Sequence, residues 1–168
     1  MNAQLAARIV NGLRDAGINF ITYLPETRLS QVLPLLKESS FFTLVPVASE
    51  AEGVSIAGGA SLVGKQCASY MEGTGLFVSC YNLQMVGVRV GIPMLLLVSY
   101  VGSPADQRNS FRFAPTGIKT ESLLKTLGIE YQVLSDGENL ETKITDAVRM
   151  MNALKMPVAL LFTGEFTS

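Results

Sequence analysis

Six short apolar segments alternate with segments of helical periodicity along the whole chain, and this alternation limits the fold more than any other feature. Short apolar runs between helices are typical of strands that are buried on both faces. Strands and helices in regular alternation form a parallel sheet that is covered by helices on both sides. We therefore predict an α/β fold: a doubly wound, six-stranded parallel sheet in one domain that spans residues 1–168.

The expected boundaries follow from the two periodicities and from cap residues. Asn2 is the expected cap of the first helix. The expected strands cover residues 19–24, 42–47, 66–71, 93–100, 131–134 and 158–162. The expected helices cover residues 3–16, 29–38, 76–90, 121–127 and 140–154, together with a helix that begins at Glu50.

Length and composition indicate a single domain with a full core. The chain has 168 residues, of which 48% are hydrophobic and only 16% are charged, and it is too short for two ordinary domains. The low charged fraction indicates that another subunit covers part of the apolar surface, so we expect an oligomer. The formal charge is -1 and no dense basic run is present, which gives no electrostatic footprint for nucleic acid.

Neither the start of the chain nor any apolar run predicts export or membrane insertion. Residues 1–17 have an amphipathic pattern without the long apolar stretch of a signal peptide. The longest apolar run, residues 92–98, is too short to span a bilayer. The two cysteines, Cys67 and Cys80, lie in segments that are expected to be core, so a disulfide framework is not expected. We therefore expect a cytoplasmic protein that binds no membrane.

Residues 49–65, SEAEGVSIAGGASLVGK, place two carboxylates at the start of a helix made largely of Gly, Ala and Ser. Ser49 and Glu52 have the spacing of a capping box, which accounts for Glu52. Glu50 lies at the first helical position, where the helix dipole tolerates a negative charge but the cap does not require one. Each glycine weakens the helix by about 1 kcal/mol relative to alanine. We therefore expect a neighbouring backbone, a partner subunit or a flat ligand to pack closely against it.

Ligands of doubly wound sheets bind beyond the carboxyl ends of the strands. Three loops are expected at that edge: residues 25–28, 48–50 and 72–75. The third loop contains Gly73 and Gly75, which either let a ligand approach the backbone or simply permit a tight turn. It matches neither the GxGxxG fingerprint nor a P-loop.

The chain contains no histidine, which excludes a Ser/His/Asp triad, a Cys/His dyad and every His-dependent zinc site. Most hydrolase mechanisms are excluded with them. Asp136 and Gly137 look like half of a metal and diphosphate motif, but their place before an expected helix favours a turn and an N-cap. No metal ligands are predicted in this chain.

These features together resemble a known family. A Glu that starts the helix after the second strand, followed by a small-residue helix ending in Gly and Lys, is similar to the pyrimidine-binding (PYR) domain of thiamine diphosphate-dependent decarboxylases. LPETRLSQVLPLL at residues 24–36, the turn at residues 71–76 and GIPMLLLVSYVG at residues 91–102 resemble in particular the alpha subunit of sulfopyruvate decarboxylases and the matching half of phosphonopyruvate decarboxylases. The resemblance covers nearly the whole chain.

The resemblance implies roles for individual residues. Glu50 is expected to hydrogen-bond N1′ of the cofactor's aminopyrimidine and so to promote loss of the thiazolium C2 proton. The expected pocket residues around the pyrimidine are Pro25, Gly73, Thr74 and Gly75.

The substrate that the resemblance implies is sulfopyruvate or a similar 3-substituted 2-oxo acid. Thr27 and Arg28 are expected either to face this substrate or to lie at a solvated helix start. Arg108 and Arg112, in the loop SPADQRNSFRF, carry guanidinium groups that suit carboxylate, sulfonate or phosphonate, although a surface role is the alternative for each.

The chain lacks the GDG motif and distant Asn with which the family binds a divalent ion and the cofactor's diphosphate. The resemblance therefore implies a separate diphosphate-binding (PP) beta subunit that binds Mg²⁺. We expect a hetero-oligomer in which PYR subunits also associate with one another, active only when both subunits are present.

Two alternatives remain at the level of sequence. The first is a non-catalytic binding or regulatory module with a PYR-like or flavodoxin-like fold. The absence of histidine and the acidic Glu72 in the glycine turn favour it. An unrelated doubly wound enzyme that binds a nucleotide phosphate at Gly73 is the other, but no fingerprint supports it.

Overall fold

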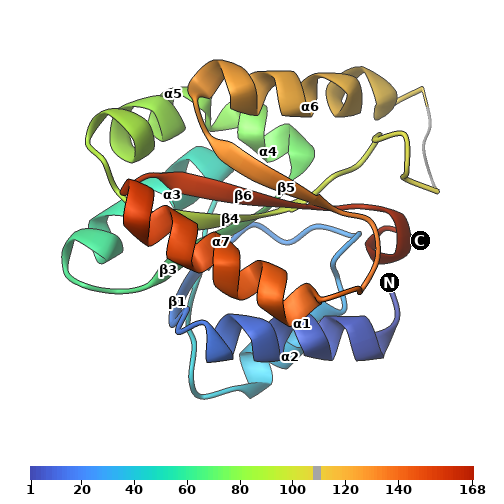
Figure 1. The fold of residues 1–168 in the computed structure, drawn as a ribbon, viewed down its shortest axis with the longest axis horizontal. Helices are drawn as coiled ribbons and strands as arrows, with labels where there is room; N and C mark the ends of the chain where they lie inside the picture. The colour runs from blue at the N-terminus through green and yellow to red at the C-terminus, as the bar shows by residue number, and fades with distance from the viewer. Residues whose placement is uncertain (108–110) are drawn as a thin grey trace.

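A computed structural model describes residues 1–107 and 111–168 of the chain. Its centre is a six-stranded sheet in which every neighbouring pair of strands is parallel. The strand order is β2-β1-β3-β4-β6-β5, and helices cover both faces, as Figure 1 shows. The predicted fold class, a doubly wound six-stranded parallel sheet, is confirmed.

Most elements lie where the periodicities placed them. The strands are β1 (Phe20–Tyr23), β2 (Thr43–Pro46), β3 (Cys67–Glu72), β4 (Met94–Ser99), β5 (Glu130–Leu134) and β6 (Pro157–Phe162). The α-helices are α1 (Ala3–Asp15), α2 (Val32–Glu38), α3 (Glu50–Leu62), α4 (Gly73–Val78), α5 (Cys80–Asn82), α6 (Ala114–Leu127) and α7 (Leu140–Leu154). A π-helix, η1 (Leu83–Arg89), follows α5, and a 3₁₀ turn, η2 (Gly164–Phe166), follows β6.

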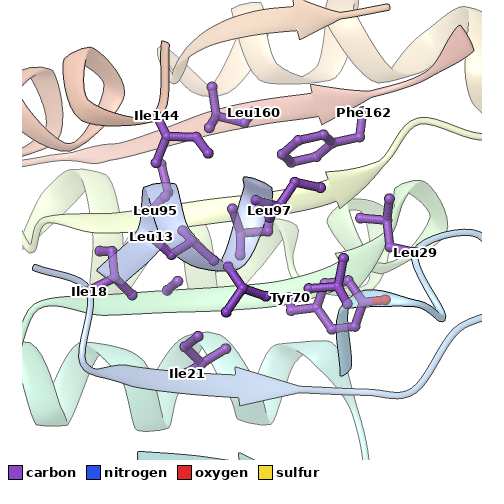
Figure 2. Close-up of a cluster of buried hydrophobic side chains, with 14 of the residues drawn as sticks. Leu13, Ile18, Ile21, Leu29, Tyr70, Leu95, Leu97, Ile144, Leu160 and Phe162 are labelled. Atoms are coloured by element: carbon purple, nitrogen blue, oxygen red, sulfur yellow. The ribbon is translucent and has the colours of Figure 1, made fainter. Parts of the chain in front are cut away.

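Each face of the sheet has its own hydrophobic core. Helices α1, α2 and α7 cover one face, where Leu13, Ile144 and Phe162 are among the buried side chains drawn in Figure 2. Helices α3, α4, α6 and η1 cover the other face, around Leu76, Leu96 and other buried residues. Strands β4 and β6 are buried along their whole length, as expected for parallel strands between two helical layers.

Helix α3 packs against the sheet through the small residues that the sequence singled out. A Cβ on Gly53 would lie 3.2 Å from Thr22 Oγ1, and the Thr22 hydroxyl donates to the Gly53 carbonyl at 3.1 Å. A Cβ on Gly58 would lie 2.5 Å from Val86 on η1. The buried half of α3 therefore needs glycine because neighbours within the same chain approach it closely. The opposite half, including Ser55 and Gly59, is exposed.

Three predictions about the elements were inaccurate. The helix expected over residues 76–90 is divided into α4, α5 and the π-helix η1. Helix α6 begins at Ala114 and not at residue 121. The proline in its first turn is tolerated there, and Gly117, although a poor helix former, is required because the Gly102 backbone lies where a Cβ at position 117 would be. Asp136 makes the expected turn, accepting from the Glu138 amide at 2.9 Å, but it does not cap α7.

No helix among the described residues has the length and apolar character that a bilayer span requires.

Candidate functional site

The start of α3 positions Glu50 at the carboxyl edge of the sheet. Ser49 is the N-cap, and its Oγ accepts from the Glu52 amide at 3.3 Å. The Glu52 carboxylate turns back and accepts from the Ala48 amide at 2.7 Å, one residue beyond the amide that a standard capping box uses. The cap therefore occupies Glu52 and leaves Glu50 available, as the sequence predicted.

The Glu50 side chain lies directly over the glycine turn that follows β3. A Cβ built on Gly75 would lie 2.5 Å from Glu50 Cγ and 2.8 Å from its Oε1. Any side chain at position 75 would therefore displace the carboxylate. Two segments that the sequence placed in the same site, the α3 start and the Gly73–Gly75 turn, are in contact.

The Glu50 carboxylate makes no hydrogen bond or ion pair within the part of the chain that the structure describes. It is half-buried, so this chain alone covers only part of it. A carboxylate that the helix cap does not use, held against backbone with one side open, is suited to bind a hydrogen-bonding group of a ligand.

The glycine turn itself is the first turn of α4. Gly73 and Gly75 are buried, whereas Thr74 is exposed and its hydroxyl donates to the Glu72 carboxylate at 3.1 Å. A Cβ on Gly73 would lie 3.4 Å from the carbonyl oxygen of Ser99 at the end of β4. Both glycines thus allow close packing at the carboxyl edge of the sheet.

Sequence reasoning missed Glu26, which fixes the loop after β1 across the neighbouring strands. Its carboxylate accepts from the Tyr70 hydroxyl at 2.6 Å and from the Ser99 hydroxyl at 3.2 Å. It also accepts from the Arg28 and Leu29 amides, both at 2.6 Å. Burial, with the Glu26 carboxylate as a second cause, raises the pKa of Tyr70, so this tyrosine remains a protonated donor. The polar Ser99 at the end of the otherwise apolar strand β4 was the available signal.

The predicted substrate residues occupy different environments. Pro25 and Thr27 are exposed, but Arg28 is buried, with its Cζ 5.4 Å from the centre of the Phe113 ring. The exposed Arg112 has its Cζ 5.8 Å from the same ring. A solvated helix start is therefore wrong for the Arg28 side chain. Arg108 lies outside the described residues.

Metal-ligating side chains do not gather at this edge. Within residues 1–107 and 111–168 there is no group of three or more Cys, Asp and Glu side chains that could hold a metal ion. Burial raises the pKa of the Cys67 thiol to about 12, so it stays a neutral thiol in the core.

Two similar proteins are alpha subunits of sulfopyruvate decarboxylase. The protein from Methanocaldococcus jannaschii is 31% identical over 158 residues, which cover 94% of this chain and 92% of that protein. The protein from Methanococcus maripaludis is 29% identical over 166 residues, which cover 99% of this chain and 97% of that protein. No family model matches the chain.

A solved structure of 2-oxoglutarate:ferredoxin oxidoreductase from Magnetococcus marinus has a similar fold. It superimposes with a TM-score of 0.70 at 17% identity, over 99% of this chain and 29% of the length of that chain. The likeness therefore extends over the whole sheet and its helices and corresponds to one part of a much larger protein.

Proposed function

This chain belongs to the family of sulfopyruvate decarboxylase alpha subunits, and we propose that it is the PYR subunit of a thiamine diphosphate-dependent decarboxylase that acts on sulfopyruvate or a similar 3-substituted pyruvate. The proposal extends along the whole chain, because both alpha subunits align with more than nine-tenths of it. The reaction removes carbon dioxide from a 2-oxo acid and therefore needs an acceptor for the electron pair of the broken bond. Thiamine diphosphate supplies that acceptor when it is bound.

The observation that carries the proposal is the position of Glu50. Its carboxylate makes no hydrogen bond or ion pair among residues 1–107 and 111–168, and it lies over a glycine that leaves no room for a side chain. This arrangement would allow the Glu50 carboxyl to hydrogen-bond a ring nitrogen of the cofactor. Glu50 would hold the proton at N1′ of the aminopyrimidine. Pro25 and residues 73–75 would lie around the ring.

The second half of the cofactor site belongs, in our proposal, to another subunit. The name alpha subunit, which both relatives carry, denotes an enzyme with more than one kind of chain. This chain lacks the family's diphosphate motif, and its described residues form no cluster of metal ligands. We therefore assign the diphosphate and Mg²⁺ to a PP-domain beta subunit.

The expected contact surface for that subunit adjoins the site. Helices α4 and α5 continue from the glycine turn and expose Phe77, Val78 and Tyr81, of which Tyr81 is 73% exposed. A subunit that binds the diphosphate must reach the edge where the Glu50 carboxylate lies. Covering the adjacent apolar side chains would stabilise the assembly by removing them from water.

A non-catalytic binding module is the less favoured alternative. Its sequence support was the absence of histidine and the acidic Glu72 in the glycine turn. The Glu72 carboxylate accepts a hydrogen bond from Thr74, which gives it a local structural role. The relatives named as decarboxylase subunits favour the catalytic function.

Co-expression with a candidate beta subunit tests the proposal. The purified complex, supplied with thiamine diphosphate and Mg²⁺, is assayed for release of carbon dioxide from a panel of 2-oxo acids that includes sulfopyruvate and pyruvate. We expect release from the complex and none from either chain alone. Release by this chain alone would contradict the division of the site between two subunits, and no release by the complex would contradict the function.

A further inference from the structure

Arg28 is a buried cation without a counter-ion among the described residues. The residue is only 9% exposed, and its guanidinium forms no ion pair or hydrogen bond with any group in residues 1–107 and 111–168, so its nitrogens, which are not fully buried, remain in contact with solvent. Its recorded contact is with the face of the Phe113 ring. Burying a charge is costly unless the charge is paired. Arg28 is largely covered but still reaches solvent, and the contact with Phe113 leaves its N–H donors unused, so Arg28 is suited to pair with an anion from outside this chain.

The nearest carboxylate along the chain does not neutralise Arg28. Both oxygens of Glu26 are engaged, with the amides of Arg28 and Leu29 and with the hydroxyls of Tyr70 and Ser99. These four bonds hold the backbone of the loop and leave the guanidinium free. Glu26 thus fixes the position of Arg28 without satisfying its charge.

A second cation lies against the same ring. Arg112 is exposed, and its guanidinium carbon lies 5.8 Å from the centre of the Phe113 ring, compared with 5.4 Å for Arg28. One aromatic side chain is therefore in contact with both a buried and an exposed arginine. Two like charges together attract an anion more strongly than either one alone.

The Arg28 loop and Glu50 are connected through short contacts along the carboxyl edge. The Ser99 hydroxyl donates to the Glu26 carboxylate. The Ser99 carbonyl oxygen would lie 3.4 Å from a Cβ built on Gly73. The turn that begins at Gly73 continues to Gly75, against which Glu50 lies. The buried cation and the carboxylate assigned to the cofactor therefore flank the same edge of the sheet.

We propose that Arg28 binds the second acidic group of the substrate, the sulfonate or equivalent acid on C3 of the 2-oxo acid, and so selects sulfopyruvate over pyruvate. The inference rests on the proposed function. A guanidinium offers paired N–H donors that match the oxygens of a sulfonate, phosphonate or carboxylate. Arg112 lies at the rim and attracts the doubly charged substrate.

The test compares substrates in the assembled complex of both subunits. Replacing Arg28 with methionine (R28M) is expected to raise the KM for sulfopyruvate about ten- to a hundredfold, because a charge-assisted hydrogen bond is lost. The kcat/KM for pyruvate is expected to stay unchanged. Calorimetric binding of sulfoacetate, a sulfonate without a 2-oxo group, should weaken by a similar factor.

The matched control is Arg149→Met, because Arg149 lies on α7 with a side chain that is 78% exposed, in a surface pair with Asp146. This variant should leave every parameter unchanged. If R28M fails to assemble, Arg28→Lys takes its place. Lysine keeps the positive charge but lacks the paired N–H donors of a guanidinium, so we expect a smaller increase in KM that is confined to sulfopyruvate.

Two results would overturn the inference while leaving the proposed function intact. One is an equal loss of kcat/KM for pyruvate and sulfopyruvate, which would indicate a structural role for Arg28. The other is an R28M complex whose KM for sulfopyruvate and whose affinity for sulfoacetate are both those of the wild type. A wild-type complex that decarboxylates no 2-oxo acid would instead contradict the proposed function and remove the premise of the inference.

Discussion

At the scale of single residues, Gly75 is required because the Glu50 side chain occupies the space where a Cβ would be. We predict that Gly75→Ala displaces the carboxylate and lowers kcat of the assembled enzyme at least about tenfold. Circular dichroism is expected to remain that of the wild type. Steady-state assays on the complex measure the effect.

Gly59→Ala is the matched control, since nothing lies within 4 Å of a Cβ at this exposed position of α3. Alanine there should raise the free energy of unfolding of the isolated chain by about 0.4–1 kcal/mol, because it favours the helix over the unfolded chain. Full activity of Gly75→Ala would mean that Glu50 is not held where the structure places it.

The geometry around Glu50 was only partly predictable from sequence. That Glu50 is left free by the helix cap was predictable, because the capping box accounts for Glu52, whereas its role toward the cofactor stays a prediction. The contact between Glu50 and Gly75 followed from the rule that loops at the carboxyl ends of parallel strands meet. The role of Glu26 and the stacking of Arg28 on Phe113 join segments far apart in the chain, and no local pattern specifies such contacts.

At the scale of elements, an ion pair joins the first helix to the last. Arg8 Nε and Glu141 Oε1 are 2.6 Å apart, and Arg8 Nη2 and Glu141 Oε2 are 2.7 Å apart, so the pair is bidentate. The hydrogen bond from Arg8 lowers the pKa of Glu141 to about 2 from its ordinary value of 4.5. A carboxyl with a lowered pKa in the folded state stabilises the fold above pH 4.5, and this contribution is lost as the pH falls toward about 2.

We therefore predict that Glu141→Gln is less stable than the wild type by less than about 1 kcal/mol at neutral pH, because the pair is partly exposed and screened by solvent. The difference should shrink as the pH falls from about 4.5 to about 3. Urea unfolding at several pH values measures it. Glu138→Gln, at an exposed acid without an ion pair among the described residues, is the control. A pH-independent difference for Glu141→Gln would contradict this assignment.

Element boundaries were predicted best where caps and apolar runs agree. Asn2 caps α1 as expected, accepting from the Leu5 amide at 2.8 Å, and Ser49 caps α3. The region after β3 was predicted least well, because the continuous helical periodicity of residues 76–90 does not reveal a π-helix. Within η1, a Cβ on Gly87 would lie 2.4 Å from the Pro157 ring, so η1 packs against β6 at very short range, a contact that no local sequence pattern reveals.

At the scale of the whole molecule, the parallel sheet was predictable because most strands are short apolar runs and every connection between successive strands contains a helix. The assembly stays a prediction, which depends on a low charged fraction and an incomplete cofactor motif. The exposed apolar side chains on α4 and α5 adjoin the Glu50 site, and we assign them to the contact with the beta subunit.

We predict that Val78→Asp weakens association with the beta subunit at least about tenfold, since a charge would be placed in an apolar contact. Val78 is 55% exposed in the single chain, so the substitution should not disturb its fold. Leu154→Asp is the control, because Leu154 is 48% exposed on α7, which covers the opposite face of the sheet. Titration calorimetry of the two chains measures the affinity, and equal effects of the two substitutions would contradict the assigned contact.

The most direct test of the account is the exchange of the thiazolium C2 proton for deuterium in the assembled complex, followed by NMR after rapid quenching. We predict that Glu50→Gln slows this exchange at least about a hundredfold, because the amide does not hold a proton at N1′ as the carboxyl does. Glu52→Gln, two residues further along the same helix, should exchange at the wild-type rate, since Glu52 serves the cap. Exchange at the wild-type rate in Glu50→Gln would contradict the account.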